Sequence, residues 1–116
     1  MLKMWLIVRN DIGMTPGKMT SQAAHAAIGA FLASQGSPEH LAYSTLSPGT
    51  KVCLQGNLEQ IGRAVEKLQR AGIPHYLVVD SGCPDFFEGR PTITALGIGP
   101  ATRSQISNIT RRFQLL

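Results

Sequence analysis

The chain has 116 residues, of which 43% are hydrophobic, so it is long enough for one domain with its own core and too short for two. Eleven Lys and Arg against seven Asp and Glu give a net charge of +4, a moderate bias toward polyanionic partners. The two cysteines, Cys53 and Cys83, lack the spacing of a zinc site or a disulfide framework, which favours a reducing, cytoplasmic location. We therefore expect one domain over residues 1–116.

The first predicted element is a buried strand over residues 4–8, where branched and aromatic residues run up to the polar pair Asn10 and Asp11. This apolar start is far shorter than a membrane span and does not resemble a secretory signal, so no membrane association is expected. Residues 17–33 follow as an alanine-rich helix, whose small side chains would let it approach a sheet closely.

The middle of the chain predicts a short helix, a strand and a longer helix. Ser37 stands before Pro38, which favours a capped helix over residues 38–46. A strand over 51–55 comes next, and Asn57 then caps an amphipathic helix that ends near Gly72.

The last third of the chain predicts two more strands and a final helix. One strand covers 76–79 and ends at Asp80, and the next covers 92–98 and is stopped by Pro100. Thr102 or Ser104 caps a short helix, and residues 113–116 could add a short terminal strand. The order β-α-α-β-α-β-β-α predicts an α/β fold with a mixed four-stranded sheet flanked by helices on both faces.

Functional side chains in such folds gather on the loops that leave the carboxyl ends of strands. Lys18 lies in the first turn of the alanine-rich helix, where the helix dipole disfavours a cation, so a functional role explains it better than helix stability. Lys18, Gln22 and His25 are spaced i, i+4 and i+7 and share one helix face. His25 lies between alanines, and a buried histidine that supports the backbone is as reasonable as one that serves the site.

Asp80 follows a run of apolar residues and would emerge at the edge of the sheet, either as a functional carboxylate or as an ordinary turn residue. The sequence contains no nucleophile elbow, no zinc-protease motif and no glycine-rich phosphate loop. Composition and spacing alone thus indicate a basic α/β domain with a candidate anion site.

Three separated motifs carry a family resemblance. The first is Arg9-Asn10-Asp11 with Met14-Thr15-Pro16-Gly17-Lys18-Met19-Thr20-Ser21-Gln22-Ala23-Ala24-His25-Ala26-Ala27, the second is Thr92-Ile93-Thr94-Ala95-Leu96-Gly97-Ile98-Gly99-Pro100-Ala101, and the third is Ile109-Thr110 with the closing Gln114-Leu115-Leu116. Together they resemble the type 2 peptidyl-tRNA hydrolases. The likeness runs nearly from end to end. It implies a mixed four-stranded sheet with flanking helices, a homodimer, and hydrolysis of the ester that joins a peptide to the terminal ribose of tRNA.

The resemblance also implies which residues form the site. The family's functional positions match Lys18, Gln22 and His25 in the first helix, Asp80 after the third strand, and Thr92 or Thr94 on the fourth. The loop from Cys83 to Arg90 departs from the family pattern, because it is longer and lacks the usual basic residue and Thr-Gln pair after the Asp.

Ester hydrolysis requires a positioned water, a base and a partner for the oxyanion, so neither a metal nor another cofactor is expected. We expect Asp80 to act on the water, Lys18 to bind the oxyanion or a phosphate, and Thr92 to hold the water or the carbonyl. Substrate-binding roles are expected for the remaining candidates: Gln22, His25, Thr94, Phe86 and Arg90. Phe86 or the adjacent Phe87 would stack on the terminal adenine, unless both rings pack against the sheet or a dimer partner, and Arg90 would replace the missing cation. Cys83 as a nucleophile is a weaker alternative, since no base is obvious beside it.

Two other functions fit the same residues. The first is a catalytically inactive module that binds tRNA or a protein, and the second is a small-molecule hydrolase that reuses the pocket. In the preferred interpretation peptidyl-tRNA is the partner, held through its phosphates, and DNA is not.

Overall fold

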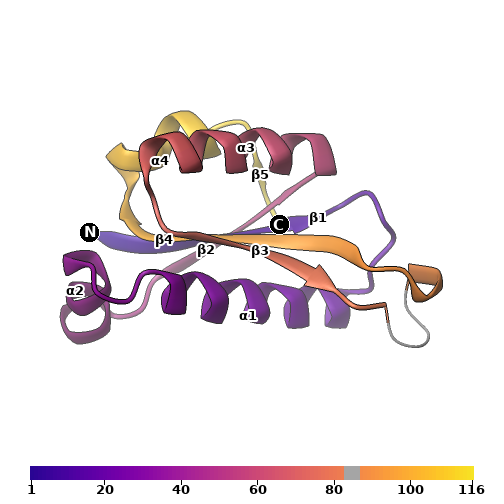
Figure 1. Cartoon of the computed structure of the whole chain (residues 1–116), viewed down its shortest axis with the longest axis horizontal. Coiled ribbons are helices and arrows are strands. Elements are labelled where there is room, and N and C mark those ends of the chain that lie inside the picture. The colour runs from indigo at the N-terminus through magenta and orange to yellow at the C-terminus, as the bar shows by residue number, and fades with distance from the viewer. Residues whose placement is uncertain (83–86) are drawn as a thin grey trace.

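Within residues 1–82 and 87–116, which the computed structural model describes, five strands form one open mixed sheet (Figure 1). Their order across the sheet is β3-β4-β1-β2-β5. The strands are β1 Leu2–Arg9, β2 Lys51–Gly56, β3 His75–Asp80, β4 Thr92–Thr102 and β5 Gln114–Leu115. Since β1, β2 and β3 run parallel and β4 and β5 run against them, the carboxyl ends of the three parallel strands lie at the same end of the sheet.

The fifth strand corrects the expected count of four. β5 has only two residues, Gln114 and Leu115, which pair antiparallel with Gln55 and Leu54 of β2. The N–H of Leu116 also donates to the carbonyl oxygen of Cys53 at 3.0 Å. A segment this short carries no periodic pattern of its own, so only its pairing with a distant strand makes it part of the sheet.

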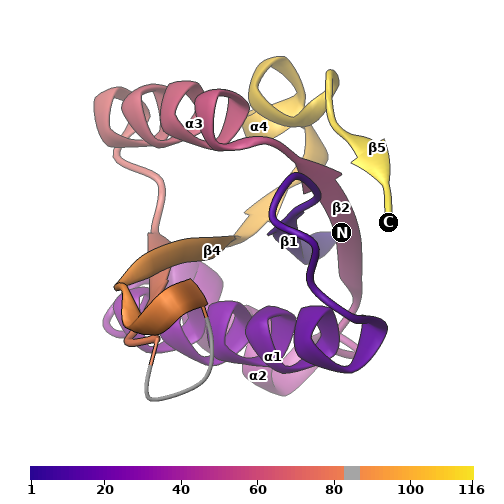
Figure 2. The same ribbon diagram turned by 90° about the vertical axis from the view of Figure 1, so that its right-hand side faces the viewer.

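Four helices cover the sheet among the described residues, and their order along the chain is the predicted one. They are α1 Pro16–Ala33, α2 Pro38–Leu46, α3 Leu58–Ala71 and α4 Arg103–Thr110. α1 and α2 lie on one face and α3 and α4 on the other, which confirms the prediction of helices on both faces (Figures 1 and 2). None of these helices is long and apolar enough to cross a membrane.

Side-chain oxygens cap three of the helices, and the caps at Ser37 and Asn57 confirm the prediction from the sequence. Thr15, Ser37 and Asn57 each accept a backbone N–H from the residue three positions on. Gly72 ends α3 with a φ of 67°, a left-handed conformation that glycine adopts without strain.

The strand β1 divides the core between the two faces by simple alternation. Trp5 and Ile7 pack beneath α3 and α4, whereas Leu6 and Val8 pack beneath α1. Because residues 4–8 of β1 are buried on both faces of the sheet, they form an unbroken apolar run instead of an alternating one.

Helix α1 lies very close to the sheet. Ala23, Ala26 and Ala30 are buried, and a Cβ atom at Gly97 of β4 would overlap the backbone carbonyl of Ala26. The close approach predicted from the small side chains is therefore confirmed. It holds the adjoining polar face of α1 beside the edge strand β3, where the candidate site lies.

The prediction that Pro100 stops the fourth strand is wrong, because β4 continues to Thr102. Ala101 pairs with Lys3 and Ile98 with Trp5, so the ladder is irregular where Gly99 and Pro100 lie. Proline lacks an N–H group, and at such an irregularity no ladder hydrogen bond is lost.

Candidate active site

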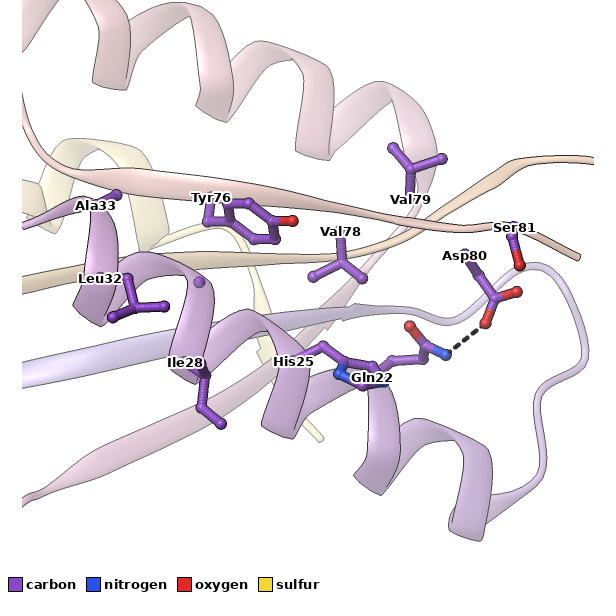
Figure 3. A pocket seen from close by; sticks show the side chains of 11 residues that line it. Gln22, His25, Ile28, Leu32, Ala33, Tyr76, Val78, Val79, Asp80 and Ser81 are labelled. Carbon is purple, nitrogen blue, oxygen red and sulfur yellow. Dashed lines mark hydrogen bonds between the residues drawn. The ribbon is translucent and has the colours of Figure 1, made fainter.

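Asp80 and Gln22 meet at the end of the sheet where β3 stops. Asp80 is the last residue of β3, and Gln22 lies on the face of α1 that packs toward it. The side-chain amide Nε2 of Gln22 donates to Oδ2 of Asp80 at 2.9 Å (Figure 3). The contact joins α1 to the end of β3, although 58 positions separate these residues.

Thr94 completes a chain of three polar side chains. Its hydroxyl donates to Oε1 of Gln22 at 2.6 Å, and its side chain is fully buried. A bulge in β4 brings the Thr94 hydroxyl to Gln22. Val78 pairs with Ala95 but Val79 pairs with Ile93, so Thr94 is an extra residue that the bulge turns toward α1.

The orientation of the Gln22 amide follows from these two partners. An ionised carboxylate only accepts hydrogen bonds, so the NH₂ group of Gln22 must face Asp80 and its oxygen must face the Thr94 hydroxyl. Only 6% of Gln22 is exposed. A buried amide with both ends bonded holds the Asp80 carboxylate in one place.

The second oxygen of Asp80 is also bound. Its Oδ1 accepts the N–H of Gly82 at 2.7 Å, in the turn that leaves β3. Gly82 has a φ of 76°, and a side chain there would collide with the backbone of Arg90. Among the described residues, each oxygen of Asp80 thus has one donor and retains acceptor capacity for a water molecule or a substrate hydroxyl.

Lys18 lies one turn before Gln22 on α1, beside the same carboxylate. A hollow of about 370 Å³ is lined by both residues and by Asp80: Gly17, Lys18, Ser21, Gln22, His25 and Asp80. The Nζ atom of Lys18 lies 5.1 Å from the centre of the Phe87 ring, within cation–π range. Phe87, which follows β3 in the chain, also packs against the core cluster beneath α1.

His25 is exposed and lines the hollow beside Lys18, so the alternative of a buried, structural histidine is wrong. Alanine neighbours along the chain do not bury a residue when the helix turns it away from the sheet, as it does here. His25 therefore shares the open polar face of α1 with Lys18.

Thr92 and Arg90 lie at the same end of the molecule. Thr92 pairs with Asp80 across the β3–β4 ladder, which puts both side chains on one face of the sheet. The Thr92 hydroxyl donates to the carbonyl oxygen of Arg90 at 2.9 Å, and Arg90 itself is exposed beside Glu88. Phe86 and Cys83 lie outside the described residues.

A larger groove of about 810 Å³ continues from Asp80 along α1 and β3 (Figure 3). It shares Gln22, His25 and Asp80 with the smaller hollow and is otherwise lined largely by apolar residues: Ile28, Gly29, Leu32, Ala33, Tyr76, Val78 and Val79, with Ser81. These apolar lining residues were not among the candidates selected from the sequence. The alternation of Tyr76, Val78 and Asp80 along one strand face was the available signal.

Arg9 supports the neighbouring loop and the start of β4. Its guanidinium binds both carboxylate oxygens of Asp11 at 3.0 Å and donates to the carbonyl oxygen of Ile93 at 3.1 Å. These hydrogen bonds from Arg9 lower the pKa of Asp11 against the opposing effect of partial burial. No group of three or more His, Cys, Asp or Glu in the described parts of the chain is arranged to hold a metal ion.

Comparison with known proteins gives a consistent family match. The family model described as "Peptidyl-tRNA hydrolase PTH2" matches residues 2–116. The chain is 34% identical over 117 residues to the "Peptidyl-tRNA hydrolase" of Methanopyrus kandleri, covering 100% of this chain and 99% of that protein. It is 36% identical to the protein of the same name from Methanothermobacter thermautotrophicus, covering 99% and 100%. A third relative of that name, from Methanococcus vannielii, is 35% identical over 96% of each chain.

Proposed function

This chain belongs to the peptidyl-tRNA hydrolase PTH2 family, and we propose that it hydrolyses the ester bond between peptide and tRNA at the Asp80 end of the sheet. The observation that carries the assignment to this site is the chain of hydrogen bonds from Thr94 through Gln22 to Asp80. Residues 1–116 act as one catalytic domain in this proposal. Its substrate is peptidyl-tRNA and its products are a free peptide and a reusable tRNA.

Asp80 is the proposed base. A water molecule bound to its free lone pairs would lose a proton to the carboxylate and attack the carbonyl carbon of the ester. The tetrahedral intermediate then collapses, the bond to the ribose oxygen breaks, and that oxygen takes the proton back from Asp80. Gln22 and Thr94 act as positioning residues, because their buried side chains leave little surface for a substrate to touch.

Lys18 is the proposed partner of the negative charge that develops on the carbonyl oxygen. Its ammonium shares a hollow with Asp80, and the backbone N–H groups of the first turn of α1 add a positive field. Contact with the Phe87 ring limits the positions that the Lys18 side chain can occupy. Thr92 would hold the water or the carbonyl, and His25 would contact the substrate at the rim.

The proposal also covers the ligands of the enzyme, its location and its oligomeric state. We expect the enzyme to bind RNA and to work in the cytoplasm during translation, and we expect a homodimer on the family resemblance. Neither a DNA ligand nor a cofactor is expected. No observation on the described residues favours an inactive binding module over a hydrolase.

The proposal is tested first with Asp80→Asn, which keeps the size of the side chain and removes the base. We expect turnover of peptidyl-tRNA to fall about 100-fold or more, with little change in substrate affinity. Glu66→Gln makes the same chemical change on an exposed residue of α3, on the other face of the sheet, and should leave the rate unchanged.

Lys18→Ala should lower the same rate to a similar extent, since it removes the charge opposite the oxyanion. Aminoacyl-tRNA serves as the second substrate and should not be cleaved. Near wild-type rates in both Asp80→Asn and Lys18→Ala would refute the site, and binding of peptidyl-tRNA without cleavage by the wild type would instead favour the inactive module.

A further inference from the structure

The apolar part of the large groove is not used by the chemistry proposed above. Ile28 and Leu32 of α1 are 64% and 53% exposed, and Tyr76 of β3 is 45% exposed. All three line the groove that begins at Asp80. Large apolar side chains gathered on one exposed surface mark a place where an apolar ligand binds.

The groove has the form of a channel between a helix and the edge of a sheet. The Tyr76 ring lies directly over Gly29, where a Cβ atom would overlap it, so a glycine is required for this wall of the groove. Val79, which points away from α1, also lines the groove (Figure 3). The groove therefore reaches the outer side of β3, an edge strand of the sheet.

The length of the groove and its position along an edge strand both fit an extended peptide. From Gln22 to Leu32 the helix rises about 15 Å at about 1.5 Å per residue, which matches about four residues of extended chain. An edge strand also offers backbone N–H and C=O groups along its outer side, and these bind any peptide regardless of its sequence.

Charge decides which half of the substrate enters this part of the groove. Asp80 is the only Asp, Glu, Lys or Arg among the described residues that line the groove. Lys18 lies on the opposite side of Asp80, toward the N-terminus of α1. A polyanion would be drawn to the Lys18 side, so the uncharged peptide is the half of the substrate that suits the apolar part.

We infer that the groove formed by Ile28, Gly29, Leu32 and Tyr76 binds the peptide part of the substrate, with apolar side chains preferred over the residues nearest the ester. This inference rests on the proposed function, because it takes Asp80 as the place where the ester is cleaved. It also gives the orientation of the bound substrate. The tRNA lies on the Lys18 side of Asp80, and the peptide lies along α1 toward Leu32.

The kinetic test compares a long and a short acyl group on the same tRNA. In the double variant Ile28→Ser/Leu32→Ser, kcat/KM for a tRNA that carries an acetylated apolar tetrapeptide should fall about tenfold or more. The value for acetylglycyl-tRNA should stay within about twofold, because that acyl group does not reach Ile28. Leu41→Ser/Leu46→Ser on α2 is the matched control, since both leucines are exposed and lie outside the groove.

A binding test does not depend on activity. An acetylated, C-amidated tetrapeptide of apolar residues, added to the wild type, should shift the backbone NMR signals of Ile28, Gly29, Leu32 and Tyr76. Adenosine monophosphate should not. If the peptide binds but no peptidyl-tRNA is cleaved, the proposed function fails and the groove assignment as a peptide site stands.

Three results would overturn the inference. The first is an equal loss of kcat/KM for both substrates in Ile28→Ser/Leu32→Ser, and the second is a shift of the groove signals by adenosine monophosphate but not by the peptide. The third is a wild-type dimer in sedimentation that becomes a monomer in the same double variant, because the groove would then be covered by a second copy of the chain.

Discussion

At the scale of single residues, the candidate site depends on how one amide is held. Gln22 links the buried Thr94 hydroxyl to the Asp80 carboxylate, and Gly82 holds the other carboxylate oxygen. A carboxylate fixed at both oxygens presents its remaining lone pairs in a constant direction. In the proposed mechanism, Thr94 would therefore affect the reaction through Gln22 without touching the substrate.

Thr94→Val tests this indirect role, because valine has nearly the shape of threonine but cannot donate to Gln22. We expect kcat to fall about tenfold with KM little changed, as for an interaction that matters in the transition state. The free energy of unfolding should fall by about 1–3 kcal/mol, since Oε1 of Gln22 is left buried without a donor. Steady-state kinetics and urea denaturation measure the two effects.

Thr94→Ser restores the hydroxyl and should recover most of kcat. If Thr94→Val lowers stability but leaves kcat at the wild-type value, Thr94 has a structural role only. Recovery of stability by serine without recovery of kcat would contradict the positioning role as well.

At the scale of elements, the site depends on how closely α1 lies on the sheet. Small residues on both sides permit the approach, with Ala26 and Ala30 on the helix and Gly97 on β4. The same approach lets Gln22 reach across to Asp80 at the end of β3. Moving the helix away from the sheet by a fraction of an ångström would lengthen that hydrogen bond.

Gly97→Ala is the sharpest test of this packing. The added methyl group would overlap the Ala26 carbonyl, so α1 must shift, and the free energy of unfolding should fall by about 1–3 kcal/mol. Gly62→Ala makes the same change at an open position inside α3 and should stabilise the protein by about 0.5–1 kcal/mol. Urea denaturation measures the change in the free energy of unfolding for both variants. A Gly97→Ala protein as stable as the wild type would contradict the close packing.

At the scale of the whole molecule, the start of α1, the end of β3 and the start of β4 lie at one end, which faces the viewer in Figure 2. The parallel strands β1 and β3 both end there, and α1 begins there. With a net charge of +4, the protein should hold tRNA through phosphate contacts. Arg90, exposed beside the site, is the candidate for one such contact.

Arg90→Ala should weaken tRNA binding and reduce the slope of log Kd against log salt by about 1. Arg70→Ala is a closely matched control on α3. The two arginine side chains are 79% and 78% exposed, and each lies 3.9 Å from a glutamate. Filter binding between about 50 and 200 mM salt measures the slopes, and equal slopes in both variants would exclude Arg90 from the tRNA path.

The sequence by itself determined α1 to α4, strands β1 to β4 apart from the end of β4, and the polar face of α1. These features depend on local chemistry: caps at Ser37 and Asn57, a stop at Gly72, and a helical spacing that joins Lys18, Gln22 and His25. Each operates over a few residues, so it can be recognised along the chain without knowledge of distant contacts.

Tertiary structure alone decided the features that depend on partners far away in the chain. The sequence offered residues 113–116 only as an optional strand, and the pairing of Gln114 and Leu115 with β2 makes it part of the sheet. Thr94 faces α1 because a bulge inserts it into the ladder with β3. The contact of Lys18 with Phe87 and the groove beside Tyr76 arise where helix α1 meets the edge strand β3 and Phe87. Such contacts have no periodic signature, because their geometry is set by packing between segments and not by the order of residues within one.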